Sequence, residues 1–353
     1  MTSQRFAAEA LLSLAAHLLE RSEVRPEDAE LVARSLLSAD QAGIYSHGLL
    51  RLPLYLDAVA AGGIDPTSRP SVVRRLGGTA VLDGAGAFGQ VTMQRAVELA
   101  TDAAQEHGIA AIAVQGSTHY GAGRFWTDQL AADGLAAVLT SSTGPVATPF
   151  GGSLPVLGTN PLTLSLPSAG DGPLVADLAT TAGAYGKIVA ARNEGTEIPE
   201  GWGVDAQAQP TTDPAAVLDG GALLPFGGHK GSGIAVLLEG FSTALTTASL
   251  AARTVDIWQD PSSRMNTGHL LIALDIAAFG DADRIRAQVA ELQAQVRSSH
   301  PGGPVVAPGD LEHARSVDGG GVLLADSTVD ALRSLALAHD LPAPEPLTDG
   351  STP

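Results

Sequence analysis

The chain has 353 residues, contains no cysteine and carries a formal net charge of −18. An acidic chain without a basic stripe is a poor partner for nucleic acid or anionic membranes, and no apolar run reaches the ~18 residues that a membrane span requires. Without cysteine there is no disulfide, no thiolate metal site and no cysteine nucleophile, a composition that suits a cytoplasmic protein.

Helical periodicity marks the N-terminal part of the chain. Apolar residues at helical spacing predict helices over Arg5–Glu20, Pro26–Ala42 and Leu50–Ala61, and the last of these ends at Gly62-Gly63. The same region lacks the long apolar segment and cleavage site of a signal peptide. The chain is therefore expected to begin with packed helices.

Four polar side chains gather where the third helix begins. Ser46 and His47 lie in the preceding turn, while Arg51 and Tyr55 are four residues apart and share one helix face. Histidine exchanges protons near neutral pH, and arginine binds a planar carboxylate with two parallel hydrogen bonds. The segment predicts a carboxylate pocket with a proton-transfer group. The alternative is an ordinary capped helix with a solvent-exposed arginine.

A glycine-rich motif follows at Gly84–Gly89, with the spacing G-x-G-x-x-G. It lies between a predicted strand and a predicted helix, which is the context of a dinucleotide-binding fingerprint. The next strand ends in Gln115-Gly116, however, without an acidic residue to bind a ribose, and the chain lacks a repeated βαβ rhythm. We therefore interpret the motif as a glycine-rich turn into a helix, with a Rossmann site as the alternative.

The rest of the chain alternates strands and helices with loops rich in glycine and proline. Strands are predicted at Ser71–Arg75, Thr79–Asp83, Ile109–Val114, Leu135–Thr140, Leu174–Asp177 and His269–Asp275. Helices are predicted over Val91–His107, Arg124–Ala132, a segment carrying Lys187, Gly227 to about Thr246, Asp281–Ser298 and Ser327–His339. Residues 302–310 are predicted to form a loop and residues 341–353 a disordered tail.

His119 is a second acid–base candidate, because it lies in a turn between a buried-looking strand and a helix. A metal site is not expected. His47, His119, His229 and His269 are far apart in sequence and form no H-E-x-x-H motif. A serine hydrolase is not expected either, because no G-x-S-x-G motif is present.

Only two of the 20 basic residues are lysines, Lys187 and Lys230, and both follow or precede glycine. Glycine lets a ligand approach the backbone closely. The segment Gly227–Gly233 opens a predicted helix, whose N-terminus would face an anion such as a pyrophosphate. The two lysines are therefore candidates for the functional site, although a biased composition could also leave two lysines by chance.

Several of these motifs, in this order, resemble the type 2 malate/L-lactate dehydrogenase family, which is separate from the Rossmann lactate and malate dehydrogenases. They are Tyr45-Ser46-His47-Gly48 with Arg51 and Tyr55, Thr118-His119-Tyr120-Gly121, Gly158-Thr159-Asn160-Pro161, Asp177-Leu178-Ala179-Thr180, Gly186-Lys187 and Gly227-Gly228-His229-Lys230-Gly231. The resemblance covers roughly residues 5 to 320.

The resemblance implies a mixed α+β fold. A largely antiparallel NAD(P)-binding domain, not a classical Rossmann fold, would occupy residues 119–249. A helical and mixed domain for substrate binding and dimerisation would combine residues 1–118 and 250–340. The family resemblance further implies an NAD(P)-dependent oxidoreductase, a homodimer and an active site between domains, with NAD or NADP as cofactor.

The resemblance also assigns roles to individual residues. His47 would be the proton donor with Ser46 as its relay, and His119 matches a histidine named as the base in another branch. Arg51 and Thr159 would bind the substrate carboxylate, with Tyr55 beside them. Cofactor contacts would come from His119, Tyr120, Gly121, Ser141, Ser142, Asp177, Leu178, Ala179, His229, Lys230, Gly309 and Asp310.

Three functions remain open at this point. The first is hydride transfer to or from a small 2-oxo or 2-hydroxy acid, the second is reduction of cyclic imino acids, and the third is nucleotide binding without catalysis. The imine-reducing branch carries an aspartate where this chain has Lys187. Because a lysine opposes an iminium cation but stabilises the negative charge that develops on a ketone oxygen, Lys187 favours the first function.

Overall fold

A seven-stranded sheet organises the computed structural model, which describes residues 3–303, 305–319 and 321–347. In spatial order the strands are β2 (Ser71–Leu76), β3 (Thr79–Asp83), β4 (Ile109–Ser117), β11 (Thr267–Asp275), β5 (Leu135–Ser141), β6 (Leu162–Leu166) and β7 (Leu174–Leu178). Only β3 and β4 pair in parallel, and every other neighbouring pair in this sheet is antiparallel. The predicted mixed, largely antiparallel sheet is thus confirmed.

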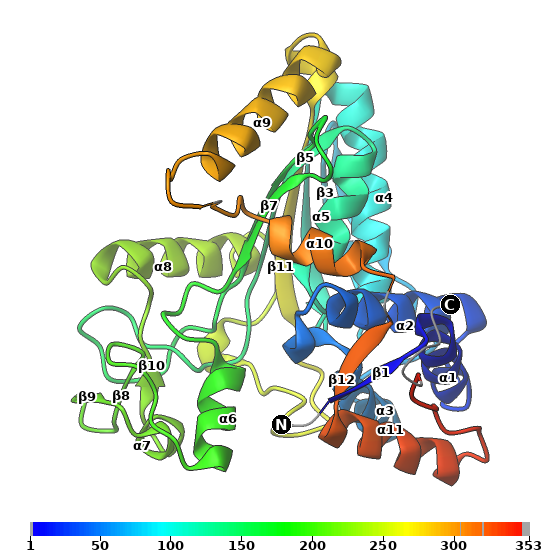
Figure 1. Cartoon of the computed structure of the whole chain (residues 1–353), viewed down its shortest axis with the longest axis vertical. Coiled ribbons are helices and arrows are strands. Elements are labelled where there is room, and N and C mark those ends of the chain that lie inside the picture. Colours follow the sequence, from blue (N-terminus) through cyan, green and yellow to red (C-terminus); the bar gives the residue numbers. More distant parts are fainter. Residues whose placement is uncertain (1–2, 304, 320, 348–353) are drawn as a thin grey trace.

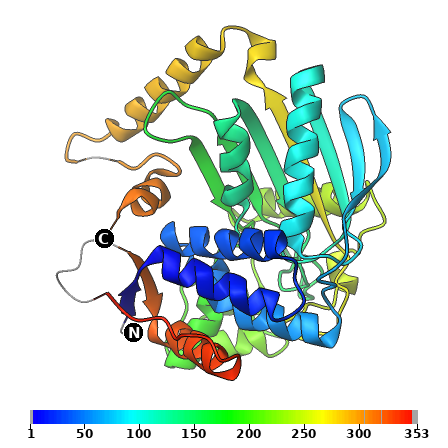
Figure 2. The same ribbon diagram turned by 90° about the vertical axis from the view of Figure 1, so that its right-hand side faces the viewer.

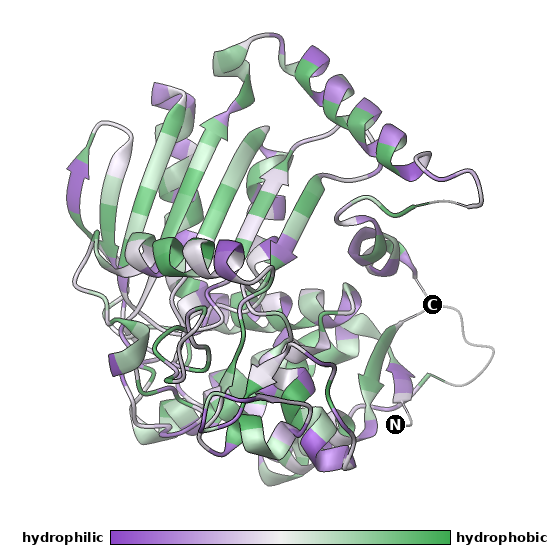
Figure 3. Ribbon diagram, turned by 90° about the vertical axis from the view of Figure 1, so that its left-hand side faces the viewer, coloured by the Kyte–Doolittle hydropathy of each residue, from purple (hydrophilic) through white to green (hydrophobic). Residues whose placement is uncertain are grey.

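Helices cover the two faces of the sheet unequally (Figures 1 and 2). Helices α4 (Gly89–His107) and α5 (Gly123–Ala132) pack along one face, and α8 (His229–Thr243) crosses the other. The apolar stripe of α4 is buried, and its last turn ends at Gly108 with a positive φ of 80°, which suits glycine. Figure 3 shows the α8 side, where a wide part of the sheet lies outside the helix.

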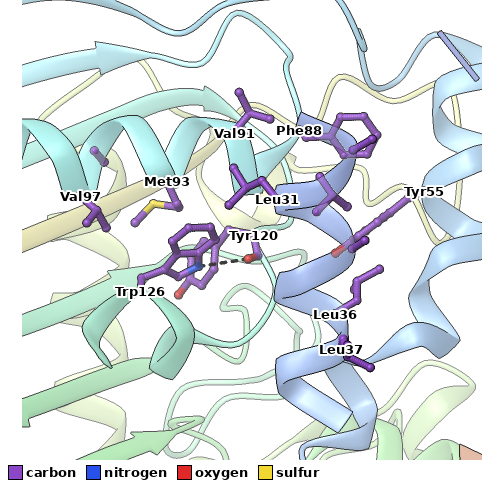
Figure 4. Close-up of a cluster of buried hydrophobic side chains, with 14 of the residues drawn as sticks. Leu31, Leu36, Leu37, Tyr55, Phe88, Val91, Met93, Val97, Tyr120 and Trp126 are labelled. Atoms are coloured by element: carbon purple, nitrogen blue, oxygen red, sulfur yellow. Dashed lines mark hydrogen bonds between the residues drawn. The ribbon is translucent and has the colours of Figure 1, made fainter. Parts of the chain in front are cut away.

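A helical layer lies below one end of the sheet. It contains α1 (Ala8–Glu20), α2 (Pro26–Gln41), α3 (Leu52–Ala61) and α11 (Asp326–Ala338), next to a small sheet of β1 (Ser3–Phe6) and β12 (Val322–Ala325). Side chains of α2, α3, α4 and α5 share one apolar core (Figure 4), in which Tyr55 and Trp126 are fully buried. This shared core fixes the helical layer against the sheet.

The remaining elements form a smaller lobe and a crossing arm. The lobe comprises α6 (Tyr185–Glu194), α7 (Pro214–Leu218), β8 (Gly203–Val204), β9 (Pro210–Thr211) and β10 (Ala222–Leu223). It has its own core around Ile188 and Leu223. The arm comprises α9 (Ala282–Arg297) and α10 (Asp310–Val317). None of the described helices has the length and apolar character needed to cross a lipid bilayer.

Several local predictions were wrong. Arg5 lies in strand β1, not in a helix, because residues 3–6 pair with β12 at the other end of the chain. Strands β6 and β12 and helix α10 were not predicted, since their patterns are short and their partners are distant in sequence.

The structure also bears on the predicted segments. Strands from both predicted domains share the seven-stranded sheet, and the division of roles between residues 119–249 and the rest stays a prediction. Within the predicted tail, the N–H of Leu347 donates to the carbonyl of Arg5 at 2.7 Å. Residues 348–353 lie outside the described part of the chain.

Candidate active site

Most of the predicted site segments meet at one edge of the sheet. Strands β3, β4, β5 and β7 end there, while β6 and β11 begin there, because antiparallel neighbours reverse direction. The edge therefore gathers the residues after β4, after β5, before β6 and after β7. It faces the helical layer that carries His47 (Figure 1).

The turn that carries His47 is fixed by Asp40 on α2. The Asp40 carboxylate accepts a hydrogen bond from the N–H of Leu49 at 2.7 Å, and a Cβ at Gly48 would overlap this carboxylate. Burial raises the pKa of Asp40 to about 7, although the Leu49 hydrogen bond opposes the shift. Only glycine at position 48 lets the turn close over Asp40.

The two candidate histidines lie together although 72 residues separate them in sequence. The rings of His47 and His119 are stacked, with centroids 5.4 Å apart and planes inclined by 24°. Burial and the charge of Arg51 lower the pKa of His47 to about 4. Burial, followed by His47 and Arg51, lowers the pKa of His119 well below its usual range. Both imidazoles are therefore neutral at neutral pH.

Arg51 borders the histidine pair. Its Nε donates to the carbonyl of Ser46 at 2.7 Å, and its guanidinium carbon lies 4.7 Å from the ring centroid of Trp258. The rings of Trp258 and His119 in turn make a T-shaped contact, with centroids 5.1 Å apart. Among the described residues the terminal nitrogens of Arg51 make no hydrogen bond or ion pair, so they are available to a carboxylate.

Ser46 and Tyr55 each contact one of the two rings. The Ser46 hydroxyl lies 2.9 Å from Nδ1 of His47, as the predicted relay requires. The Tyr55 hydroxyl lies 2.6 Å from Nδ1 of His119 and also contacts Gln90. Tyr55 is fully buried, so its hydroxyl is enclosed with His119 and Gln90, and its predicted contact with substrate stays a prediction.

Thr159 belongs to the loop side of the same region. Its N–H donates to the hydroxyl of Thr143 at 2.9 Å, and the next residue, Gly144, lies against Asp256. Burial raises the pKa of Asp256 to about 6, and nearby Arg51 opposes this shift. These contacts place the Thr159 loop close to the arginine that was predicted to share its ligand.

Ser141 and Ser142 face inward and fasten β5 to β11. The Ser141 hydroxyl donates to the carbonyl of Ser142 at 2.7 Å and lies 2.8 Å from Nδ1 of His269. The Ser142 hydroxyl accepts from the N–H of Gly268 at 3.1 Å. Both serines are buried, and their hydroxyls make hydrogen bonds within the protein. Tyr120 packs its ring against His269, and Gly121 has a φ of 85°.

Asp177 and Gly309 meet around Arg124, at the far end of the edge. The Asp177 carboxylate accepts from the hydroxyl of Thr163 at 2.8 Å and from the N–H of Arg124 at 3.0 Å, which stabilises the start of α5. The Arg124 side chain donates to the carbonyl of Gly309 at 3.0 Å. Leu178 is exposed and Ala179 half-buried beside this cluster.

Asp310 is already paired with a positive charge. Its two carboxylate oxygens accept hydrogen bonds from Arg297 at 2.7 and 2.9 Å, and these bonds lower its pKa. The neighbouring residue Gly309 has a φ of 92° and caps the start of α10.

The two lysines lie on separate helices. His229 and Lys230 are exposed at the N-terminus of α8, where no side chain caps the helix. Lys187 is exposed in the first turn of α6, with its ammonium 6.0 Å from the Trp202 ring centroid. In the described part of the chain Lys187 makes no hydrogen bond or ion pair with the histidine pair.

Sequence reasoning missed Gln90, Asp256 and Trp258. Gln90 follows the glycine-rich motif directly, and Trp258 is one of only three tryptophans. A lone tryptophan in the polar segment around Asp260 was a usable signal, because such a ring needs a packing partner. Asp256 carried no local signal.

At one end of the mixed sheet a neutral histidine pair lies beside an available arginine, an arrangement that suits proton exchange with an anionic small molecule. A sequence model of the malate/L-lactate dehydrogenase family matches residues 6–333, and the chain belongs to this family. The resemblance inferred from the ordered motifs is thereby confirmed.

Relatives with two different activities are similar to this chain over most of its length. An L-sulfolactate dehydrogenase from Methanothermobacter thermautotrophicus is 35% identical over 308 residues, covering 87% of this chain and 89% of that protein. A Delta(1)-pyrroline-2-carboxylate/Delta(1)-piperideine-2-carboxylate reductase from Pseudomonas syringae pv. tomato is 37% identical over 318 residues, covering 88% and 90%. The solved structure of the Methanocaldococcus jannaschii sulfolactate dehydrogenase has a TM-score of 0.89 at 30% identity, covering 96% of this chain and 98% of that chain.

Proposed function

We propose that this protein is an NAD(P)-dependent oxidoreductase that moves a hydride between the nicotinamide and a small 2-oxo or 2-hydroxy acid. The stacked pair of His47 and His119 beside Arg51 is the observation that carries the proposal. Interconverting a ketone and an alcohol requires a hydride at carbon and a proton at oxygen. The nicotinamide supplies the hydride when bound.

Arg51 positions the substrate in this proposal. Its terminal nitrogens bind the carboxylate while Trp258 supports the guanidinium from one face. Thr159 lies on the adjoining loop and contributes a further hydrogen bond to the same group. A carboxylate held at this point leaves the neighbouring carbonyl carbon close to the histidine pair.

Proton exchange falls to the histidines. In their neutral form they are ready to accept the proton that leaves a hydroxy acid. In the direction of reduction, the bound carboxylate offsets the positive charge of Arg51, which otherwise depresses the pKa of His47. Substrate binding therefore favours the protonated imidazole that reduction needs.

The residues at the end of the sheet suit a dinucleotide. The first N–H groups of α8 have no side-chain cap, two glycines with positive φ precede them, and Lys230 is exposed beside them. Such a helix terminus binds a pyrophosphate. Leu178, Ala179 and the Gly309 backbone lie at the far end of the edge, where the rest of the cofactor would extend.

The decisive test follows NADH and NADPH absorbance with a panel of acids. Purified protein is incubated with pyruvate-like and oxaloacetate-like 2-oxo acids, and in parallel with piperideine-2-carboxylate. Oxidation of either cofactor by a 2-oxo acid is the expected result. Cofactor binding without turnover of any compound would instead support a non-catalytic nucleotide-binding protein.

Cyclic imine reduction is the second candidate, because the relative from Pseudomonas syringae that bears this activity in its name is 37% identical. Lys187 argues against it, since a lysine opposes a cationic iminium. A clear preference for piperideine-2-carboxylate in the same panel would establish the second candidate and reject the first.

We also propose that the protein forms a homodimer through the α8 face of the sheet. Helix α8 exposes Ile234, Leu237 and Phe241, three large apolar side chains at helical spacing. Leu164 and Leu166 on β6 are exposed too, and alternation places them on this face, since Ser165 points toward α5. A contiguous apolar face of this kind is typical of an interface.

A cytoplasmic location is proposed from composition alone. A chain without cysteine gains nothing from an oxidising compartment. Fractionation of the source cells, with the protein traced by antibody, tests this assignment.

A further inference from the structure

A chain of hydrogen bonds runs behind His119. The side-chain nitrogen Nε2 of Gln90 donates to the Tyr55 hydroxyl at 3.1 Å, and this hydroxyl lies 2.6 Å from Nδ1 of His119. Gln90 and Tyr55 have no exposed surface at all. Solvent therefore cannot replace either partner.

The donors and acceptors in this chain determine where each hydrogen lies. An amide nitrogen only donates, so the Tyr55 oxygen accepts from Gln90. Because Tyr55 is fully buried and Nδ1 of His119 is the one acceptor for its hydroxyl hydrogen among the described residues, that hydrogen goes to Nδ1. Burial raises the pKa of Tyr55 to about 12, so the phenol keeps this hydrogen. A neutral imidazole carries one N–H, which must then be at Nε2.

We propose that Gln90 is a positioning residue that acts through the Tyr55 hydroxyl to hold His119 in the tautomer protonated at Nε2. Nε2 of His119 has no hydrogen-bond partner in the described part of the chain, and this atom is not enclosed by other protein atoms. Its N–H is thus available to a bound molecule.

The glycine-rich motif explains how Gln90 reaches this position. Gly89 begins α4, and its N–H donates to the Thr118 hydroxyl at 2.8 Å. A Cβ at Gly89 would overlap the backbone carbonyls of Thr118 and His119. The motif therefore presses the start of α4 against the His119 segment, and Gln90, the next residue, is fixed relative to the ring.

The consequence for the reaction rests on the proposed function. With Nε2 already protonated, His119 donates a hydrogen bond to the substrate oxygen or to the cofactor. It cannot accept the hydroxyl proton at that atom. Proton exchange then belongs to His47, whose Nδ1 faces Ser46.

Nitrogen-15 spectra of histidine-labelled protein read the tautomer directly, without any need for turnover. Replacing His119 by glutamine assigns its signals. The expected wild-type spectrum at neutral pH shows His119 protonated at Nε2 and bare at Nδ1. A wild-type spectrum with the proton at Nδ1 would overturn the proposal.

Two variants test the role of Gln90, with Q94E as the control because it makes the same change one turn further along α4. In Q90E the carboxylate accepts from Tyr55, so His119 should protonate at Nδ1. In Q90M the hydroxyl is released, and a mixture of tautomers is expected. Wild-type spectra in both Q90M and Q90E would contradict the proposal. If Q90E does not fold, Q90M and the wild type still decide.

Kinetics separate this inference from the proposed function. In Q90M, kcat should fall about 10- to 100-fold, because part of the protein then carries the other His119 tautomer. A fall in kcat with an unchanged His119 tautomer would mean that Gln90 acts through packing, against the proposal. If the wild type reduces no acid but shows the Nε2 tautomer, the proposed function fails and the positioning role stands.

Discussion

Arg51 is supported by its neighbours in a way that leaves its binding groups available. Its Nε is used by the Ser46 carbonyl and its face by Trp258, so the fork of terminal nitrogens is held in place before a ligand arrives. Preorganisation of this kind lowers the entropy cost of binding. We therefore expect little of the binding free energy of each charged hydrogen bond to a carboxylate to be lost in ordering the Arg51 side chain.

Arg51→Ala should raise the KM for a 2-oxo acid about 10- to 100-fold, because hydrogen bonds to a charged group are lost. Cofactor affinity should not change. Arg51→Lys is the matched control, because it keeps the charge but loses the forked pair of donors. Its KM should lie between those of wild type and Arg51→Ala. Steady-state kinetics on the same acid measure this effect, and unchanged constants in Arg51→Ala would remove Arg51 from the site.

Lys187 tests the charge argument at the level of one side chain. Lys187→Asp should lower kcat/KM for ketone reduction far more than it lowers cofactor affinity, because a carboxylate opposes the negative charge developing on oxygen. Side-by-side assays with a 2-oxo acid and piperideine-2-carboxylate measure the change in preference. Equal ratios in variant and wild type would show that Lys187, beside Trp202, does not face the reacting atoms.

At the scale of elements, the turn between α2 and α3 depends on a buried carboxyl group. Burial raises the pKa of Asp40 from 3.8 to about 7. Between these values the folded protein keeps a proton that the unfolded chain has released, so stability falls as pH rises through this window. The turn holding His47 is thus most stable when Asp40 is protonated.

Asp40→Asn should remove this dependence while keeping an oxygen for the Leu49 N–H. The free energy of unfolding of the variant minus that of wild type should rise by roughly 2 to 4 kcal/mol from about pH 4 to about pH 8, because only the wild type loses stability as Asp40 ionises. Denaturant titrations at the two pH values measure the difference, in which all other titrating groups cancel. A difference that is the same at both pH values would contradict the assignment.

Helix α8 combines an uncapped N-terminus with Lys230, so we expect its first turn to bind the dinucleotide. Lys230→Ala should weaken NAD(P)H binding about tenfold, as measured by fluorescence titration, because a charged contact is lost. Circular dichroism should show an unchanged fold, since Lys230 is exposed. Lys187→Ala is the control. Equal NAD(P)H affinity in Lys230→Ala and wild type would contradict this assignment and favour the alternative dinucleotide site at Gly84–Gly89.

At the scale of the whole molecule, one face of the sheet is covered incompletely. Leu237 on α8 is 63% exposed, between the exposed side chains of Ile234 and Phe241. Helix α8 lies across a sheet face that is otherwise largely open (Figure 3). Burying such a stripe against a second copy is more favourable than leaving it in water. This stripe supports the homodimer that we propose through this face.

Leu237→Glu should convert a dimer into a monomer, as measured by light scattering with sedimentation analysis. Leu337→Glu is the matched control, because Leu337 is 82% exposed on α11, a different helix. The control should remain dimeric. A monomeric wild type, or two dimeric variants, would argue against this interface.

The local sequence pattern was enough to predict an element wherever its hydrogen-bond partners lie within a few residues. The helix containing Tyr55, the short strands β2 and β3, and the glycine start of α8 all follow from spacing and turn chemistry. The predicted start of that helix at Leu50 was wrong, because Leu49–Arg51 form a short 3-10 helix and Arg51 caps α3. The ordered motifs also identified the family, because a set of short segments in one order is far more specific than any single segment.

Tertiary structure alone decided which of these segments meet. The pairing of β1 with β12, the approach of His119 to His47 and the position of Trp258 over Arg51 all join residues far apart in sequence. Periodicity reports only which face of an element is apolar, and it says nothing about which distant element covers that face. The surroundings of Gln90 and Asp256 could not be predicted for the same reason, since a buried polar side chain acquires its chemistry from the partners that folding brings to it.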